Sequence, residues 1–133
     1  MDVDGAFDRA FSPISAEDRE SASRAGLGQW SCDLTDGNRL TWSDAIFDIF
    51  GLPRGVALCR NETVGFYTES SRAVMERLRA HAIRYRRGFL FDARINGADG
   101  TRRWMRLIAA PVCAGARVTA LHGLKLDVSA TYR

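Results

Sequence analysis

The stretch 30–51 constrains the fold most, because it holds the signals for two strands and a helix with almost no linker between them. Asp36-Gly37 predicts a tight hairpin turn, since glycine adopts the positive φ that such turns need. The residues on either side then form short antiparallel strands over 29–34 and 39–42. Alternation along the first strand puts Trp30, Cys32 and Leu34 on one face.

A short helix is predicted to follow the second strand directly. Ser43 occupies a favourable N-cap position, and an acidic residue, Asp44, suits the first turn. Gly51 is the expected C-terminal stop, and Pro53 blocks continuation. The apolar side of this helix consists of Ile46, Phe47, Ile49 and Phe50.

The middle of the chain predicts one long helix. Residues 54–63 are irregular, with room for one helical turn. A helix over 69–87 follows, capped by Thr68 or Ser70 and closed by Gly88. Its apolar stripe consists of Val74, Leu78, His81 and Tyr85, widened by Met75 and Ala82.

The last third predicts three antiparallel strands, over 89–96, 102–112 and 118–128, joined by glycine-containing turns. In the first of them, Phe89, Phe91, Ala93 and Ile95 face one way. The order of elements is therefore strand-strand, helices, strand-strand-strand. We predict an α+β fold, in which a five-stranded antiparallel sheet joins the first hairpin to the last strands and carries the helices on one face.

Length and composition fit one globular domain. The 133 residues are 46% hydrophobic and 26% charged, with a net charge of +3. No apolar run is long enough to cross a membrane and no secretory signal begins the chain, so we expect a cytoplasmic protein. The arginines are spread over a helix and strands, which argues against nucleic-acid binding. Three scattered cysteines indicate neither a disulfide framework nor a zinc site.

The order of short motifs resembles a PAS domain, the sensory module of many bacterial signalling proteins. Gly28-Gln29-Trp30, Asp33-Leu34, Trp42-Ser43 and Phe50-Gly51-Leu52-Pro53 are similar to the opening of the family's G-x-W-x-x-D-L…W-S…F-G-L-P variety. Asp99-Gly100 before Trp104 resembles its later turn and strand, and Asp127-Val128-Ser129 resembles its closing D-I-T signature. Tyr67-Thr68-Glu69-Ser70 departs from the His-Pro-x-Asp often found before the long helix.

The resemblance implies a domain over 27–129, with a flanking segment over 1–26 that includes a helix near 16–25. Residues 130–133 would begin a linker or tail. The expected role is a sensor in two-component signalling, belonging to a histidine kinase or similar transmitter, which relays through Asp127, Val128 and Ser129. A homodimer formed through the N-terminal helix and the open sheet face is expected, with Leu90, Leu121 and Trp104 as candidate residues of that face. A free-standing PAS protein that acts only by contacts stays open, as does a small cone-fold enzyme of the ketosteroid isomerase-like type.

No catalytic motif is found, so we expect a non-enzymatic chain. Cys59 lacks the neighbours that a flavin adduct requires in this family, and His81 on the long helix is a candidate haem ligand, although no cofactor is the simplest expectation. A small ligand between sheet and helices is possible. The candidate lining residues are Phe47, Phe50, Met75, Leu78, His81, Phe91 and Leu107.

Overall fold

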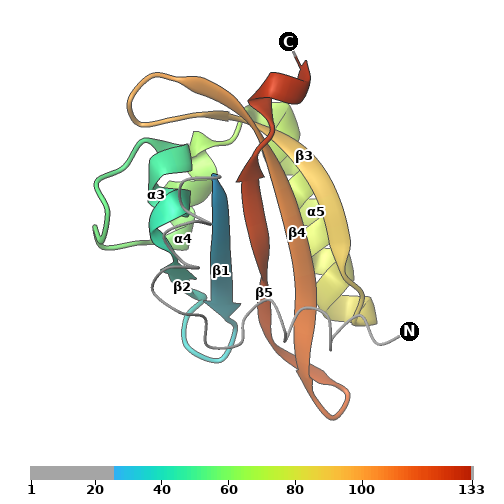
Figure 1. Cartoon of the computed structure of the whole chain (residues 1–133). Coiled ribbons are helices and arrows are strands. Elements are labelled where there is room, and N and C mark those ends of the chain that lie inside the picture. The colour runs from blue at the N-terminus through green and yellow to red at the C-terminus, as the bar shows by residue number, and fades with distance from the viewer. Residues whose placement is uncertain (1–25, 133) are drawn as a thin grey trace.

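The computed structural model describes residues 26–132, and the helix expected near 16–25 lies outside this range. Five strands and three α-helices make up the domain (Figure 1). The elements are β1 (Leu27–Asp33), β2 (Arg39–Trp42), α3 (Asp44–Phe50), α4 (Arg60–Thr63), α5 (Glu69–Tyr85), β3 (Phe89–Asn96), β4 (Arg102–Ala114) and β5 (Arg117–Asp127), with 3₁₀ turns η1 (Val64–Phe66) and η2 (Ser129–Tyr132).

The sheet joins the two ends of the domain, as predicted. Its strand order is β2-β1-β5-β4-β3, and every neighbouring pair is antiparallel. The first hairpin therefore meets the last three strands through β1 and β5, where Trp30 lies opposite Gly123. This pairing fixes which side chains share the inner face, because a slip of one residue would turn each strand over.

All three helices lie on one face of the sheet, with α3 beside β1 and α5 across β3 and β4 (Figure 1). The core lies between these two layers. Its largest side chains with almost no exposed surface are Phe50, Ile46, Ile95, Met105 and Leu121. Trp42 stacks on Phe50 with ring centroids 4.7 Å apart, which fixes the hairpin against α3.

Two glycines allow the layers and strands to approach closely. A Cβ atom on Gly28 would lie 2.1 Å from Cγ1 of Ile46, so α3 contacts β1 where a side chain is absent. A Cβ atom on Gly123 would lie 1.7 Å from the carbonyl oxygen of Ile108 on the neighbouring strand. A side chain at Gly123 would require backbone movement, and one at Gly28 would displace the Ile46 side chain.

The ends of the helices differ from the prediction in two places. The Ser43 hydroxyl does not cap α3, because it accepts a hydrogen bond of 2.8 Å from the Gln29 N–H and so connects to β1. Helix α5 begins at the predicted cap, where Thr68 accepts from the Ser71 N–H. It ends at Tyr85 with Arg86 in the left-handed region, φ 56°, while Gly88 is needed instead where the chain passes the Ala109 carbonyl.

The buried stripe of α5 is one position away from the predicted one. Its buried residues are Ser71, Met75 and Ala82, whereas His81 is exposed and Tyr85 is 51% exposed. Helix α5 packs against β3 and β4, and these strands determine which face is buried. The spacing of apolar residues along the helix carries no information about them.

The outer face of the sheet was predicted to hold Leu90, Trp104 and Leu121. Leu90 lies there and is 61% exposed, and Trp104 lies there with its ring stacked on Tyr132. Leu121 is wrong: it is 2% exposed and belongs to the core. It alternates in phase with Gly123 and Lys125, which occupy the inner face of β5.

Candidate functional site: a cavity on the inner face of the sheet

A cavity of about 50 Å³ lies between the sheet and the helices. Most of its wall is apolar, and its polar groups come from β1, β5, the α4 region and α5. The lining residues are Trp30, Cys32, Leu40, Arg60, Thr63, Val64, Tyr67, Met75, Arg79, Phe89, Leu107, Leu121 and Lys125. A small apolar hollow with a few convergent polar groups is the usual form of a ligand site.

The most unusual member of the wall is Lys125, the chain's single lysine, which is 7% exposed on β5. Its Nζ atom lies 5.5, 5.1 and 5.0 Å from the ring centroids of Trp30, Trp42 and Phe50. This arrangement is an aromatic cage, in which the negative ring faces attract a cation. Within residues 26–132, no carboxylate forms an ion pair with Lys125.

Burial makes the charged form of this lysine costly. The pKa of Lys125 is lowered from 10.5 to about 7, mainly by loss of hydration and to a smaller extent by nearby Arg60, while the Cys32 side chain acts in the opposite direction. The ammonium group therefore has aromatic neighbours but no counter-charge in the described part of the chain.

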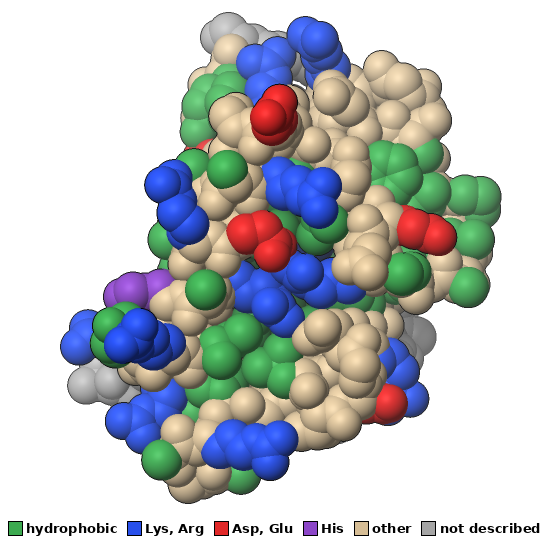
Figure 2. Space-filling view, turned by 180° about the vertical axis from the view of Figure 1, so that it is seen from behind, with side chains coloured by type: hydrophobic (Ala, Val, Ile, Leu, Met, Phe, Trp, Pro, Cys, Tyr) green, Lys and Arg blue, Asp and Glu red, His purple; other side chains and the backbone are tan. Residues whose placement is uncertain are grey.

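Two guanidinium groups add positive charge to the same wall. Arg60 forms an ion pair with Glu76 of α5, and its side chain is only 17% exposed. Arg79 donates a hydrogen bond of 2.9 Å from Nη2 to Oδ1 of Asn38 in the first hairpin turn. On the helix side of the molecule, basic side chains gather beside a patch of hydrophobic ones (Figure 2).

Two donors in the cage have no acceptor. The Nε1 atoms of Trp30 and Trp42 are buried without a hydrogen-bond partner among the described residues. A buried N–H group without an acceptor costs free energy, and such groups often mark a place that a ligand or water completes. Trp30 contributes to the cavity wall itself. Tyr67 also lines it, and burial raises the pKa of its hydroxyl.

The structure brings together only part of the predicted pocket. Met75 and Leu107 line the cavity, and Phe50 lies behind it as a wall of the lysine cage. Phe47 packs edge-on against Trp42 with centroids 5.3 Å apart, away from the cavity wall. Leu78 and Phe91 are half-buried and do not line it.

His81 was predicted both as a lining residue and as a candidate haem ligand. It lies on the exposed side of α5, with its ring tilted by 44° against that of Tyr85 at a centroid distance of 4.7 Å, and it does not line the cavity. The interpretation of His81 as a pocket residue is therefore wrong, for the reason given for the helix stripe. No group of three or more His, Cys, Asp or Glu residues that could hold a metal occurs within 26–132.

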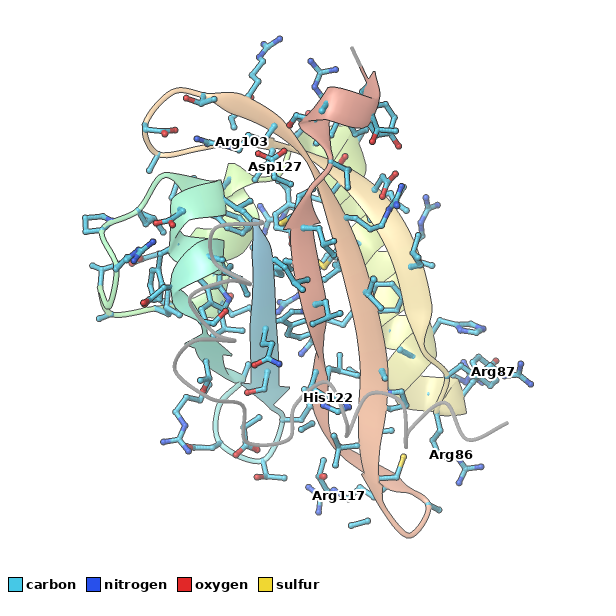
Figure 3. All side chains as sticks on the ribbon, in the orientation of Figure 1. Arg86, Arg87, Arg103, Arg117, His122 and Asp127 are labelled. Carbon is cyan, nitrogen blue, oxygen red and sulfur yellow. The ribbon has the colours of Figure 1, made fainter. Side chains whose placement is uncertain are left out.

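The predicted relay residues lie where the chain leaves β5. The Val128 N–H donates to the carbonyl of Trp104 over 2.9 Å, and the Ser129 hydroxyl accepts from the Trp104 N–H over 3.0 Å. Asp127 accepts from the Ser129 N–H and lies 3.9 Å from Nε of Arg103 (Figure 3). These contacts use both the backbone N–H and the carbonyl of Trp104, so they hold the end of β5 against β4.

The following turn, η2, is fastened to the outer face of the sheet. Tyr132 stacks on Trp104 with centroids 4.2 Å apart and donates a hydrogen bond to Asp92. Asp92 also accepts two hydrogen bonds from Arg106, of 2.8 and 3.0 Å, and these charge-assisted bonds lower the pKa of the carboxyl. Asp92 thus pairs with Arg106 and Tyr132.

Sequence reasoning missed Lys125 as a site residue. A usable signal was present, because Leu121, Gly123 and Lys125 recur with the strand period of two and Leu124 and Leu126 lie on the opposite face. A lone lysine in phase with core positions indicates a buried cation. The companion residues Arg60, Arg79 and Trp30 come from separate elements, and no local pattern joins them.

This combination of a five-stranded antiparallel sheet, helices on one face and a cavity between them defines a PAS-like sensor fold. The family model for the PAS fold matches residues 23–122. The chain therefore belongs to the PAS fold family. The predicted fold class is confirmed, and the chain does not have the alternative cone fold.

Solved structures agree in fold. The N-terminal domain of a diguanylate cyclase with a PAS/PAC sensor from Marinobacter aquaeolei superimposes with a TM-score of 0.72 at 16% identity, covering 80% of this chain and 99% of that one. A sensory box histidine kinase/response regulator from Burkholderia thailandensis gives 0.69 at 17% identity, covering 88% of each chain. A PAS domain from Colwellia psychrerythraea gives 0.65 at 14%, covering 86% and 97%.

A search of curated protein sequences gave no match. No helix within residues 26–132 is both long enough and apolar enough to cross a membrane.

Proposed function

We propose that this chain is the sensory part of a signalling protein, in which a small molecule bound in the cavity changes how the C-terminal segment is held. The observation that carries the proposal is the position of Lys125 on β5, two residues before Asp127. A ligand that moves the lysine acts on the strand whose end holds Val128 and Ser129 against Trp104. Ligands shift such an equilibrium only through different affinities for its two states.

The output partner is proposed from the relatives. Two of the similar structures are described as parts of a diguanylate cyclase and of a histidine kinase. An effector of this kind, joined after η2, would receive the movement of the C-terminal segment. The chain itself is proposed to be non-enzymatic, on the ground that its sequence carries no catalytic motif.

We also propose a homodimer formed through the N-terminal flanking segment and the outer sheet face. Leu90 on that face is 61% exposed, and a dimer formed through the outer sheet face would cover it. Sedimentation equilibrium at micromolar concentration tests it. A dimer is expected, and a monomer throughout the range would contradict it.

The relay is tested by filling the cavity through mutation. Leu121→Phe on β5 and Met75→Phe on α5 each add bulk to the wall, while Leu90→Phe adds similar bulk on the exposed face. Hydrogen exchange at 129–132 is measured by mass spectrometry. We expect either cavity variant to change the exchange rate at 129–132 at least about threefold, as a shift of roughly 0.7 kcal/mol would do, with no change in the control.

Unchanged exchange in a folded cavity variant would contradict coupling between the cavity and the C-terminal segment. Both cavity variants are included because overpacking destabilises some sites. If circular dichroism shows that both have lost the native fold, the cavity has no room to admit a ligand, and the proposal fails as well.

A further inference from the structure

Among the described residues, the cavity is lined by basic side chains and by no carboxylate. The Nζ atom of Lys125 is held among three aromatic rings, and the basic side chains of Arg60 and Arg79 line the same hollow. Among the ion pairs of residues 26–132, Glu76 pairs with Arg60. Charge in the cavity is therefore positive, and a neutral or cationic occupant would leave it so.

The cavity also offers a hydrogen-bond donor that lacks an acceptor. Trp30 lines the hollow, is 7% exposed, and its Nε1 has no partner within residues 26–132. An occupant with a negatively charged oxygen would accept from this N–H and pair with the lysine. A carboxylate supplies both the missing negative charge and the missing hydrogen-bond acceptor.

The size and the remaining wall limit the rest of the occupant. One water needs about 10–15 Å³ of such volume, so the cavity of about 50 Å³ holds a molecule of only a few non-hydrogen atoms. Much of the rest of the wall is apolar, formed by Val64, Met75, Phe89, Leu107 and Leu121. A short aliphatic tail fits this wall, whereas a fully polar inorganic anion leaves it without a partner.

We propose that the cavity binds a short-chain monocarboxylate of two to four carbons, with its carboxylate on Lys125 and Trp30 and its alkyl tail against the apolar wall. The inference rests on the proposed function, since it names the ligand class for the same site. It also states how the ligand is recognised: the ligand supplies the missing negative charge, and Lys125 pairs with it.

The test is calorimetric titration of the whole chain with acetate, propionate and butyrate, and with propionamide and butyramide as neutral analogues of the same shape. We expect the carboxylates to bind at least about 30-fold more tightly than the amides, since a buried charged hydrogen bond accounts for a difference of this order. Equal affinity for acids and amides would overturn the proposal. Phosphate binding as tightly as propionate would overturn it too, because the apolar wall would then play no part.

Three variants locate the binding group. Lys125→Met keeps the length of the side chain and removes the charge, and it is expected to reduce propionate affinity at least about 30-fold. Trp30→Phe keeps an aromatic ring and removes the N–H, and it is expected to reduce affinity about tenfold. Arg117→Met removes an exposed cation at the far end of the sheet and should leave affinity unchanged (Figure 3).

If Lys125→Met folds and retains propionate affinity, the assignment of the site is wrong. The inference and the proposed function fail in distinguishable ways. Propionate that binds without altering hydrogen exchange at 129–132 supports the ligand class and contradicts the relay. If the cavity-filling variants alter this exchange but the protein does not bind carboxylates, the relay is supported and the ligand class is contradicted.

Discussion

Replacing Lys125 by methionine is expected to make the ligand-free protein more stable. The lysine is 7% exposed and has no ion-pair partner within residues 26–132, so folding removes its hydration without supplying a counter-charge. Methionine has nearly the same length and an apolar end that suits the aromatic cage.

The magnitude follows from the pKa of the lysine. A pKa of about 7 in place of 10.5 corresponds to roughly 5 kcal/mol of unfavourable free energy for the charged form, at about 1.4 kcal/mol per unit of pKa. This is the net cost, because any attraction of the ammonium group to the three ring faces at 5.0, 5.1 and 5.5 Å would itself raise the pKa. We therefore expect Lys125→Met to raise the free energy of unfolding by up to about 5 kcal/mol at and below pH 7.

The stability gained by Lys125→Met is expected to decrease as the pH rises. Between pH 7 and 10.5 the unfolded chain keeps the proton on Lys125 while the folded chain loses it, so the stability contribution of this group rises with pH. Below pH 7 both states are protonated and the full penalty is present. The advantage of Lys125→Met is thus largest at or below neutral pH and shrinks toward pH 10.

Urea unfolding followed by tryptophan fluorescence measures the difference at pH 6.5 and at pH 9.5. Arg117→Met serves as the control, because its exposed charge contributes less than about 0.5 kcal/mol. If Lys125→Met is less stable than the unmutated chain at pH 6.5, the lysine has a compensating interaction and the reasoning about an unpaired charge is wrong.

Three further predictions concern the fold and the C-terminal segment. Gly123→Ala should destabilise the domain by more than about 3 kcal/mol in urea unfolding, because its Cβ would meet the Ile108 carbonyl, whereas Gly65→Ala, with open space around it, should stay within about 1 kcal/mol; similar values for both would contradict the close strand approach. Tyr132→Phe should raise hydrogen exchange at 129–132 several-fold by removing the bond to Asp92, and an unchanged rate would show that η2 is held otherwise. Acid should also loosen this turn. Arg106 and Tyr132 lower the pKa of Asp92, so the stability that this carboxylate contributes is lost as the pH falls below about 4, the pKa of the group in the unfolded chain. Protection of 129–132 that persists through this range would contradict the ion-pair anchor.

Most of the architecture could be predicted from local patterns. The hairpin turn, the cap of α5 and the alternation of β3 each follow from residues adjacent in sequence. The joining of the first hairpin to the last three strands follows from the order of elements, because strands at both ends of the chain must form one sheet that the helices cover. The face of α5 could not be predicted as well, because Met75 rather than Val74 contacts β3 and β4, and this choice depends on strands distant in sequence. Packing decided between two nearly equal helical stripes.

The candidate site was predictable only in its apolar part. Met75 and Leu107 follow from core patterning, but the cage depends on Lys125 and Trp30 meeting across the β1–β5 pairing. Single-strand alternation identifies Lys125 as inward-facing without showing what surrounds it. The three-dimensional pairing supplies the aromatic rings and, with them, the reason that a cation lies there.

The most direct test of the account uses the fact that Lys125 is the only lysine in the chain. Protein labelled with ¹³C in lysine gives one side-chain Cε signal, whose chemical shift can be followed against pH with and without saturating propionate. The account predicts a pKa near 7 in the free protein, in agreement with the buried cage, and a clear rise when the carboxylate is bound. A pKa close to 10.5 that propionate does not change would contradict it.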